Sequence, residues 1–405
     1  MWSEINRNNR LFMLGNFLFA LSDGLWMNLR QLHLGNLGAT PLEVGSILGI
    51  VALAGSLLPL PAGILTDRIG PKRVILGSWL IAAVGTIIAA LATDWYLASL
   101  GFGVFMLVIA ANPATVTYVI LNTDDQQHGN DGQAQRVMAT VFASWPAAMI
   151  FAPTVGGLIA ERWGIASAMW IATLGFVVSV AAFAFAKDVR PTQIEQRSDS
   201  RSLFGNQRFV ALTIYYSLVL VALYLGYVLA PTYLEMMRGY STADIGFLFS
   251  ILSLGSLGFN IIVRRTRSQV SFVVLIVAIW VGTLLIWLTK NALVMTLAFA
   301  LLGAISTMWL LAQSSFGQIV KPQQRGLALG ITETVANGAV ALASWLAGAL
   351  YERTAAHDLP LIVGAITIGV AFVLWFAFGI GRLMQVPDSN SSELDYQQTN
   401  EQPAA

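Results

Sequence analysis

About twelve apolar stretches, each long enough to cross a lipid bilayer as a helix, dominate this sequence. A membrane-spanning helix needs roughly 20 mostly apolar residues. The stretches lie at 11–34, 44–65, 74–93, 96–121, 136–159, 165–186, 209–233, 244–263, 270–289, 292–316, 327–350 and 359–381. They are continuously apolar rather than alternating, which excludes a transmembrane β-barrel. We therefore expect an all-α membrane protein with about twelve transmembrane helices.

The composition agrees with a surface that meets lipid. Of the 405 residues, 56% are apolar and only 11% are charged, against roughly 25% charged in a typical soluble domain. The chain has no Cys, and its three His are widely separated, so we expect no disulfide framework, no thiol catalysis and no metal site. A formal net charge of +1 gives no electrostatic footprint for nucleic acid. We expect no cofactor.

One polar segment divides the chain into two halves. Residues 187–208 contain no apolar face and separate the sixth apolar stretch from the seventh. We expect an N-terminal six-helix bundle at 1–186, a cytoplasmic linker at 187–208, a C-terminal six-helix bundle at 209–382 and a disordered cytoplasmic tail at 383–405. No cleavage site of small residues follows the first stretch, so we interpret it as a retained helix rather than a signal peptide.

The distribution of Lys and Arg predicts the orientation. With the N-terminus inside, 17 of the 22 Lys and Arg fall in inside segments, four fall outside, and Arg30 lies within the first span. Cytoplasmic loops carry such an excess of basic residues. The sequence thus predicts a multi-pass protein of the cell (inner) membrane whose two termini are cytoplasmic.

An internal repeat relates the two halves. Residues 38–45 read GATPLEVG and residues 239–246 read GYSTADIG, and each stretch links the first and second helix of its half. A second pair, Glu161-Arg162 and Glu352-Arg353, follows the fifth helix of each half. Parallel repeats imply a pseudo-two-fold axis along the membrane normal and a substrate site between the halves near mid-membrane.

The loop between the second and third spans carries a family signature. Residues 63–73 read GILTDRIGPKR, which resembles the major facilitator superfamily pattern G-x-x-x-D-R-x-G-R-R/K. The matching residues are Gly63, Asp67, Arg68, Gly70 and the pair Lys72 and Arg73, while Pro71 shifts the basic pair by one position. The resemblance covers the chain to about residue 385 and implies a monomeric transporter, similar to drug/proton antiporters, with a small-molecule substrate, protons and the lipid bilayer as partners.

In this family the counterpart of Asp67 lies against the N-terminus of the eleventh helix, here near residues 326–329. Free N–H groups and the helix dipole favour an anion there. We expect Lys72 or Arg73 to pair with Asp124 or Asp125 at the inside end of the fourth helix. Such contacts hold the halves together on the cytoplasmic side and favour an outward-open state.

The fifth span carries a partial match to a pattern that the family associates with exporters, G-P-x-x-G-G. Residues 152–157 read APTVGG, so Pro153, Gly156 and Gly157 match and Ala152 replaces the first Gly. Because Pro and paired Gly also permit bending and close helix packing, an ordinary packing motif is the alternative. An Arg that is common on the fourth helix of drug/proton antiporters is replaced by Phe102.

Three ionisable residues remain inside the predicted spans, namely Asp23, Arg30 and Glu333. Such groups are costly in a membrane and are functional candidates by default. Asp23 is the first candidate for a proton-coupling site and Glu333 the second, because a carboxyl group in a low-dielectric cavity can bind and release a proton. The alternatives are a static Asp23–Arg30 pair and a structural role for Glu333 at the inner gate.

Candidate substrate contacts lie mainly on the first, fourth, seventh and tenth helices, which line the cavity in this family. They are Trp26, Arg30, Asn112, Tyr215, Tyr224, Trp309 and Gln313. An aromatic cavity with few charges suits an apolar or amphipathic solute, although aromatic residues also concentrate at membrane interfaces.

The sequence thus predicts a proton-coupled secondary transporter that works by alternating access and exports a hydrophobic or amphipathic small molecule. The alternative is proton-coupled uptake of a small metabolite whose carboxylate binds Arg30. No G-x-x-x-x-G-K-[ST] motif is present for ATP. A membrane enzyme would need clustered catalytic groups and a sensor would need a soluble output domain, and the sequence shows neither.

We predict that Asp67→Asn impairs transport while membrane insertion stays intact, because the change removes the charge that the helix terminus favours. Transport in proteoliposomes, measured at matched protein content, checks this expectation. Transport by the variant at the rate of the parent protein would contradict it.

Overall fold

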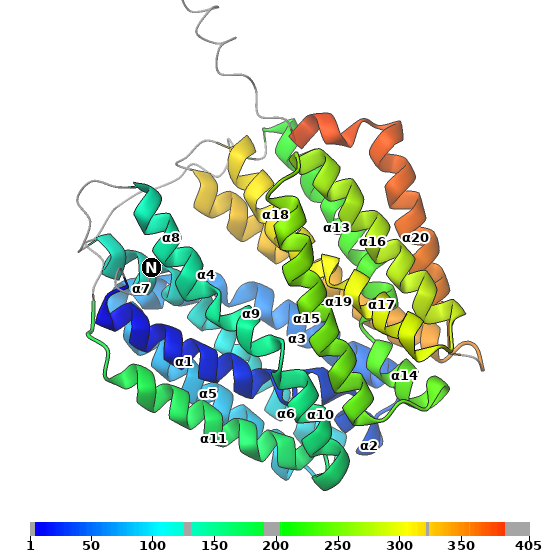
Figure 1. Cartoon of the computed structure of the whole chain (residues 1–405), viewed down its shortest axis with the longest axis horizontal. Helices are drawn as coiled ribbons and strands as arrows, with labels where there is room; N and C mark the ends of the chain where they lie inside the picture. Colours follow the sequence, from blue (N-terminus) through cyan, green and yellow to red (C-terminus); the bar gives the residue numbers. More distant parts are fainter. Residues whose placement is uncertain are drawn as a thin grey trace, which may run out of the picture.

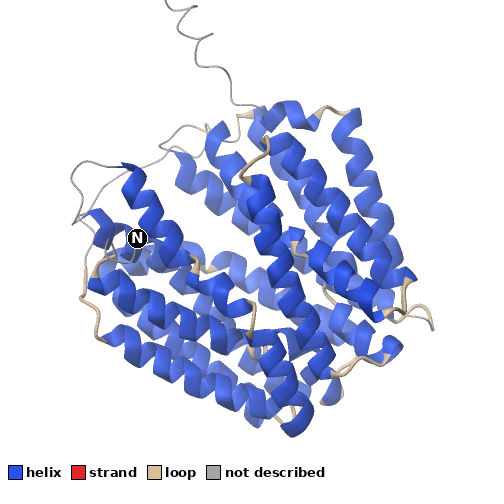
Figure 2. Cartoon of the chain, in the orientation of Figure 1, coloured by secondary structure: helices blue, strands red, loops and turns tan. Residues whose placement is uncertain are grey.

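A computed structural model describes residues 5–124, 131–189, 203, 205–320, 324–355 and 357–384. Within these ranges the chain is helical and contains no strand (Figures 1 and 2). The first half consists of α1 (Arg7–Gly24), η2 (Met27–Leu29), α2 (Arg30–Asn36), α3 (Pro41–Leu57), α4 (Pro59–Ile69), α5 (Pro71–Leu91), α6 (Trp95–Met106), η3 (Leu107–Ala110), α7 (Ala111–Asp124), α8 (Asp131–Phe142), α9 (Ser144–Met149), α10 (Ala152–Trp163) and α11 (Ile165–Ala184).

The second half repeats this order after the linker. It consists of α13 (Gln207–Tyr227), α14 (Ala230–Arg238), α15 (Thr242–Val263), α16 (Ser268–Leu288), α17 (Ala292–Leu302), α18 (Ala304–Ile319), α19 (Arg325–Tyr351), α20 (Leu359–Ala377) and η5 (Ile380–Met384). Most of the predicted linker and tail falls outside the described residues.

The described helices confirm an all-α membrane fold. Ten helical segments are long and apolar enough to cross a membrane, and the pair Pro41–Leu57 and Pro61–Ile69, bent by 48°, makes an eleventh. The first predicted span differs, because it is broken between α1 and η2 and continues as α2. α1 is 18 residues long, but with Arg7, Arg10 and Asp23 it is not among the helices apolar enough to count as a span.

The repeated sequence motif forms the same local structure twice. At the start of α3, the Thr40 Oγ1 accepts a hydrogen bond from the Glu43 N–H and the Glu43 carboxylate accepts one from the Thr40 N–H. Ser241 and Asp244 make the same reciprocal pair at the start of α15. Each pair satisfies backbone donors that the first helical turn leaves free, so the two halves begin their second spans alike.

Aromatic side chains fill the core of the first half. The Phe19 ring lies 5.0 Å from that of Trp79 and 4.6 Å from that of Phe176, measured between centroids. In the second half, Phe272 stacks on Trp375 at 4.7 Å. Offset and edge contacts of this kind add to the dispersion energy of packing, which stabilises each half as a body of its own.

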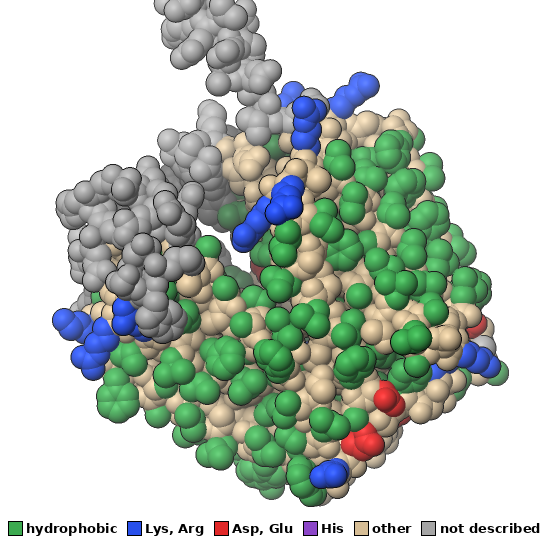
Figure 3. Space-filling view, viewed as in Figure 1, with side chains coloured by type: hydrophobic (Ala, Val, Ile, Leu, Met, Phe, Trp, Pro, Cys, Tyr) green, Lys and Arg blue, Asp and Glu red, His purple; other side chains and the backbone are tan. Residues whose placement is uncertain are grey.

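The two halves meet at one end and diverge at the other (Figure 1). They pack along two seams, α3 against α19 and α10 against α15. The open end carries most of the described Lys and Arg, and Figure 3 shows part of this basic surface. Arg68 lies in the last turn of α4, Arg73 lies in the first turn of α5 and Arg264 follows α15, all at this end. We call it the basic face. The other end, which holds the starts of α3 and α15, is called the opposite face.

Close helix packing in the first half depends on Gly101 of α6. A Cβ atom at this position would lie 2.7 Å from the backbone oxygen of Gly85 on α5. We predict that Gly101→Ala lowers the free energy of unfolding by about 1–3 kcal/mol, the usual cost of overpacking. Thermal unfolding in detergent micelles measures the effect.

Gly103→Ala is the matched control, since a Cβ atom two residues further along α6 would meet nothing within 4 Å. It is expected to leave stability unchanged or slightly raised, because Ala is the better helix former. Equal destabilisation by the two changes would contradict the packing argument.

Candidate functional site

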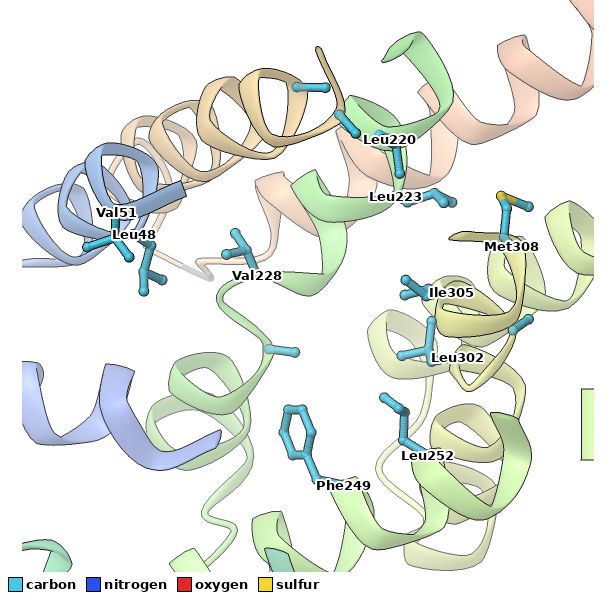
Figure 4. Packing of buried hydrophobic residues seen from close by; sticks show 14 of the residues in the cluster. Leu48, Val51, Leu220, Leu223, Val228, Phe249, Leu252, Leu302, Ile305 and Met308 are labelled. Atoms are coloured by element: carbon cyan, nitrogen blue, oxygen red, sulfur yellow. The ribbon is translucent and has the colours of Figure 1, made fainter. Parts of the chain in front are cut away.

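A central cavity of about 360 Å³ lies between the two halves. Arg30 and Gln31 of α2 line it from the first half, and Tyr224, Trp309 and Glu333 line it from the second. Figure 4 shows Leu48 and Val51 of α3 across this space from Val228 and Phe249, which belong to the second half. The volume falls in the range of small-molecule sites.

The helices around this cavity are discontinuous. The first span breaks at Leu25 and Trp26, the fourth passes through the 3₁₀ segment η3, and the seventh breaks at Val228 and Leu229 between α13 and α14. Discontinuous helices are typical of substrate sites near mid-membrane, since they free backbone groups for binding. One freed group is satisfied across the halves, because the Gln31 Nε2 donates a hydrogen bond of 3.3 Å to the Val228 carbonyl.

The cavity carries opposite charges on opposite walls. The Arg30 side chain belongs to the first half, its Nη1 contacts the Met27 sulfur at 3.4 Å, and its Nε has no hydrogen-bond partner among the described residues. Glu333 belongs to the second half, and its Oε2 accepts a hydrogen bond of 2.8 Å from the Gln313 Nε2. A bound solute therefore meets a cation from one half and a carboxyl group from the other.

Asp23 lines a second cavity, of about 490 Å³, within the first half. Its side chain is only 6% exposed, and its Oδ1 has no hydrogen-bond partner among the described residues. Asn16, Asn112 and Trp145 line the same cavity. Met27, Met106 and Ile109 border both cavities, so the cavity that Asp23 lines adjoins the one that Arg30 lines.

The other substrate-contact candidates divide into two groups. Tyr224 and Trp309 line the central cavity, and Gln313 supports Glu333 from behind it. Trp26 is buried in the core of the first half, 5.5 Å from the Phe102 ring, and the Tyr215 hydroxyl donates to the Ala371 carbonyl at 2.9 Å. Neither of these two side chains lines the central or the second cavity.

Sequence reasoning did not single out Gln31 and Asn16. Each is an amide inside an apolar stretch, and Gln31 directly follows Arg30. An amide in such a stretch is the signal that points to both positions.

The residues of the signature motif lie at the basic face. Asp67 and Arg68 are exposed, and a Cβ atom at Gly63 would meet nothing within 4 Å. The Lys72 ammonium donates to the Ala184 carbonyl at 2.7 Å, and Arg73 forms an ion pair of 3.6 Å with Asp188.

Gly70 has a φ of 90°, which suits glycine at the turn between α4 and α5. The side chains of Asp124 and Asp125 lie outside the described residues, so their pairing with the basic residues stays a prediction.

The glycines of the fifth-span motif serve close backbone packing. Pro153 lies in the first turn of α10. A Cβ atom at Gly156 would collide with the backbone of Leu25, at the break in the first span. One at Gly157 would collide with the backbone of α15 at Thr242. The motif thus brings α10 against both the broken first span and the other half.

Comparison with known proteins shows the family. The model of the Major Facilitator Superfamily matches residues 12–303, and the chain belongs to this superfamily of membrane transporters. It is 26% identical over 147 residues to the inner membrane transport protein YajR of Escherichia coli (strain K12), covering 35% of this chain and 31% of that protein. It is also 20% identical over 204 residues to the uncharacterized MFS-type transporter MJ1560 of Methanocaldococcus jannaschii, covering 49% of this chain and 51% of that protein. The matched regions thus span about a third and about half of the lengths of these relatives.

Solved structures share the fold over nearly the whole chain. The nucleoside transporter NupG superposes with a TM-score of 0.73 at 18% identity, covering 93% of this chain and 99% of that one. An auto inhibited peptide transporter of the POT family superposes with a TM-score of 0.71 at 14% identity, covering 93% of this chain and 97% of that one. The chain is thus a multi-pass membrane protein of a transporter family.

The hydrogen bond behind Glu333 provides a test of the site geometry. We predict that Gln313→Ala lowers the free energy of unfolding by about 1–3 kcal/mol, because a carboxyl group at the cavity wall loses its donor. Chemical or thermal unfolding in detergent measures the change.

Gln318→Ala is the control on the same helix, since the Gln318 amide is exposed and makes only a hydrogen bond of 3.4 Å to Ser314. Its effect is expected to be near zero. A Gln313 variant as stable as the Gln318 variant would show that Glu333 does not depend on this donor.

Proposed function

We propose that this protein is a proton-coupled secondary transporter that exports an amphipathic small molecule by alternating access. The observation that carries the proposal is the central cavity, because residues of both halves line it and the halves diverge only at the basic face. Moving the halves about such a cavity exposes its contents to one side of the membrane at a time. The excess of Lys and Arg supports a cytoplasmic position for the basic face.

The walls of the cavity support an amphipathic substrate. Tyr224, Tyr227 and Trp309 offer aromatic surface, while Arg30 and Glu333 offer one charge of each sign. A solute with an apolar ring and a polar or charged group is complementary to these walls. The match of Pro153, Gly156 and Gly157 to the exporter-associated pattern supports export.

Uptake of a small metabolite is the second candidate, and Arg30 favours it. A half-buried guanidinium at a cavity wall, whose Nε has no partner among the described residues, is a ready site for a carboxylate. Arg30→Lys keeps the charge but loses the planar array of donors. If an acid binds Arg30 during uptake, its uptake is therefore expected to fall in the Arg30→Lys variant.

The proton is proposed to bind Asp23. This carboxyl group is buried, has an unpartnered oxygen and lines a cavity next to the substrate cavity. Protonation removes a charge from a site of low dielectric, so the two protonation states favour different conformations of the broken first span.

We predict that Asp23→Asn abolishes the dependence of transport on a pH gradient, because Asn cannot exchange a proton. A panel of fluorescent amphipathic compounds and small organic acids is assayed in proteoliposomes with an imposed gradient. Asp94→Asn is the control, since Asp94 caps α6 at the surface and Asn is an equally good cap.

Collapse of the gradient in cells gives the direction: a rise of the amphipathic probe inside cells supports export. Gradient-dependent transport by the Asp23 variant at the rate of the parent protein would contradict the assignment of the proton site.

A further inference from the structure

At the opposite face, a glutamate of each half binds the N-terminus of a helix in the other half. Glu161 lies in the last turn of α10, in the first half. Its Oε2 accepts hydrogen bonds from the Ser241 hydroxyl at 2.9 Å and from the Ala243 N–H at 3.2 Å. Ser241 and Ala243 lie at the start of α15, in the second half. We call this contact the α10–α15 latch.

The second contact has the same chemistry. Glu352 directly follows α19 in the second half, and its Oε1 accepts a hydrogen bond of 3.0 Å from the Leu42 N–H at the start of α3. We call this contact the α3–α19 latch. In both latches the carboxylate accepts a hydrogen bond from the N–H of the second residue of the helix, Leu42 in α3 or Ala243 in α15.

A glycine lies one helical turn before the glutamate in each latch, and each glycine packs against the other half. Gly157 lies four residues before Glu161, and a Cβ atom there would collide with the backbone at Thr242 and crowd Gly246. Gly348 lies four residues before Glu352, and a Cβ atom there would lie 2.7 Å from the Pro41 carbonyl oxygen. Two backbones must therefore approach closely before either carboxylate can reach its helix terminus.

The latches exist only while the opposite face is closed. A carboxylate at a helix N-terminus is stabilised by free N–H groups and by the helix dipole. When the halves separate at this face, both glutamates return to water and both helix termini lose an acceptor. A contact that is present in one state alone shifts the balance between the states by its own free energy.

We propose that Glu161 and Glu352 are positioning residues of the transport cycle, which hold the opposite face closed and set how often it opens. This inference rests on the alternating access proposed above. The resemblance to the superfamily assigns a gating role to Asp67 at the basic face. The two latches place the same kind of interaction, a carboxylate on a helix terminus, at the other end of the molecule.

Spin-label distances test the proposal without knowledge of the substrate. The chain contains no Cys, so Tyr96→Cys and Leu293→Cys introduce the labels alone. These side chains are 68% and 81% exposed and lie on the two halves at the opposite face. Double electron–electron resonance in lipid nanodiscs then gives the populations of short and long distances.

Glu161→Gln and Glu352→Gln are each expected to raise the ratio of the long-distance to the short-distance population about two- to fivefold, which is the usual strength of an exposed carboxylate at a helix terminus. The double variant is expected to multiply the two effects, because the latches are distinct contacts. Gly348→Ala, which wedges the α3–α19 seam, is expected to shift the ratio in the same direction.

Glu43→Gln and Asp244→Asn are the matched controls. They remove a charge from the same two helix termini, and the hydrogen bonds of both carboxylates run to their own helix. Glu43→Gln is the stricter control, because the Ser241 hydroxyl donates to Glu161 as well as to Asp244. The proposal is overturned if these controls shift the populations as much as the glutamate variants, or if the glutamate variants leave them unchanged. A single short distance in the parent protein and in the Gly348 variant at every pH would instead overturn alternating access itself.

Discussion

The bilayer offers no water to unpaired backbone groups, and the rest of this structure depends on that constraint. Each N–H and C=O group at membrane depth needs a partner within the protein, which is why helices form across all of the described spans. Some of the helix breaks lie beside the central cavity. The carbonyl of Val228 is freed where α13 ends, and an amide of the other half, Gln31, binds it. At this break a polar side chain of the other half satisfies the freed backbone group.

Glycine decides how closely the two halves approach. Gly157 and Gly348 bring helices of different halves into backbone contact at the opposite face, and Gly156 brings α10 against the broken first span. Small residues drive helix association in membranes, because lipid tails give no hydrophobic advantage to larger ones. Glycines therefore permit both the close packing of the closed face and the contact of α10 with the break between Asp23 and Arg30.

Scarcity of charge makes the few buried ionisable groups informative. Arg30 and Glu333 face one cavity from opposite halves, whereas Asp23 faces another, with Met27 bordering both. Spacing along a continuous helix predicts that Asp23 and Arg30 share a face. The break at Leu25 and Trp26 lies between the two residues, and their side chains line two adjoining cavities. In the transport cycle proposed above, a proton and a substrate act on the same short segment.

The sequence by itself determined the class of protein. Long apolar stretches, the signature at residues 63–73 and the repeat of GATPLEVG as GYSTADIG depend on local composition and order, so they predict a helical transporter of the major facilitator type without any long-range contact. Only the tertiary structure decided which polar residues meet. Trp26 and Tyr215 lie on spans that line the cavity in this family, yet Trp26 packs on Phe102 and the Tyr215 hydroxyl donates to the Ala371 carbonyl.

Likewise, the glutamates at the ends of the two fifth spans, Glu161 and Glu352, are in the sequence only a repeated Glu-Arg pair. Folding places each of them on a helix terminus of the other half. Residues far apart in the chain meet according to how the two halves pack. That packing depends on the close approach of backbones at a few glycines, and the local pattern of apolar and polar residues does not encode it.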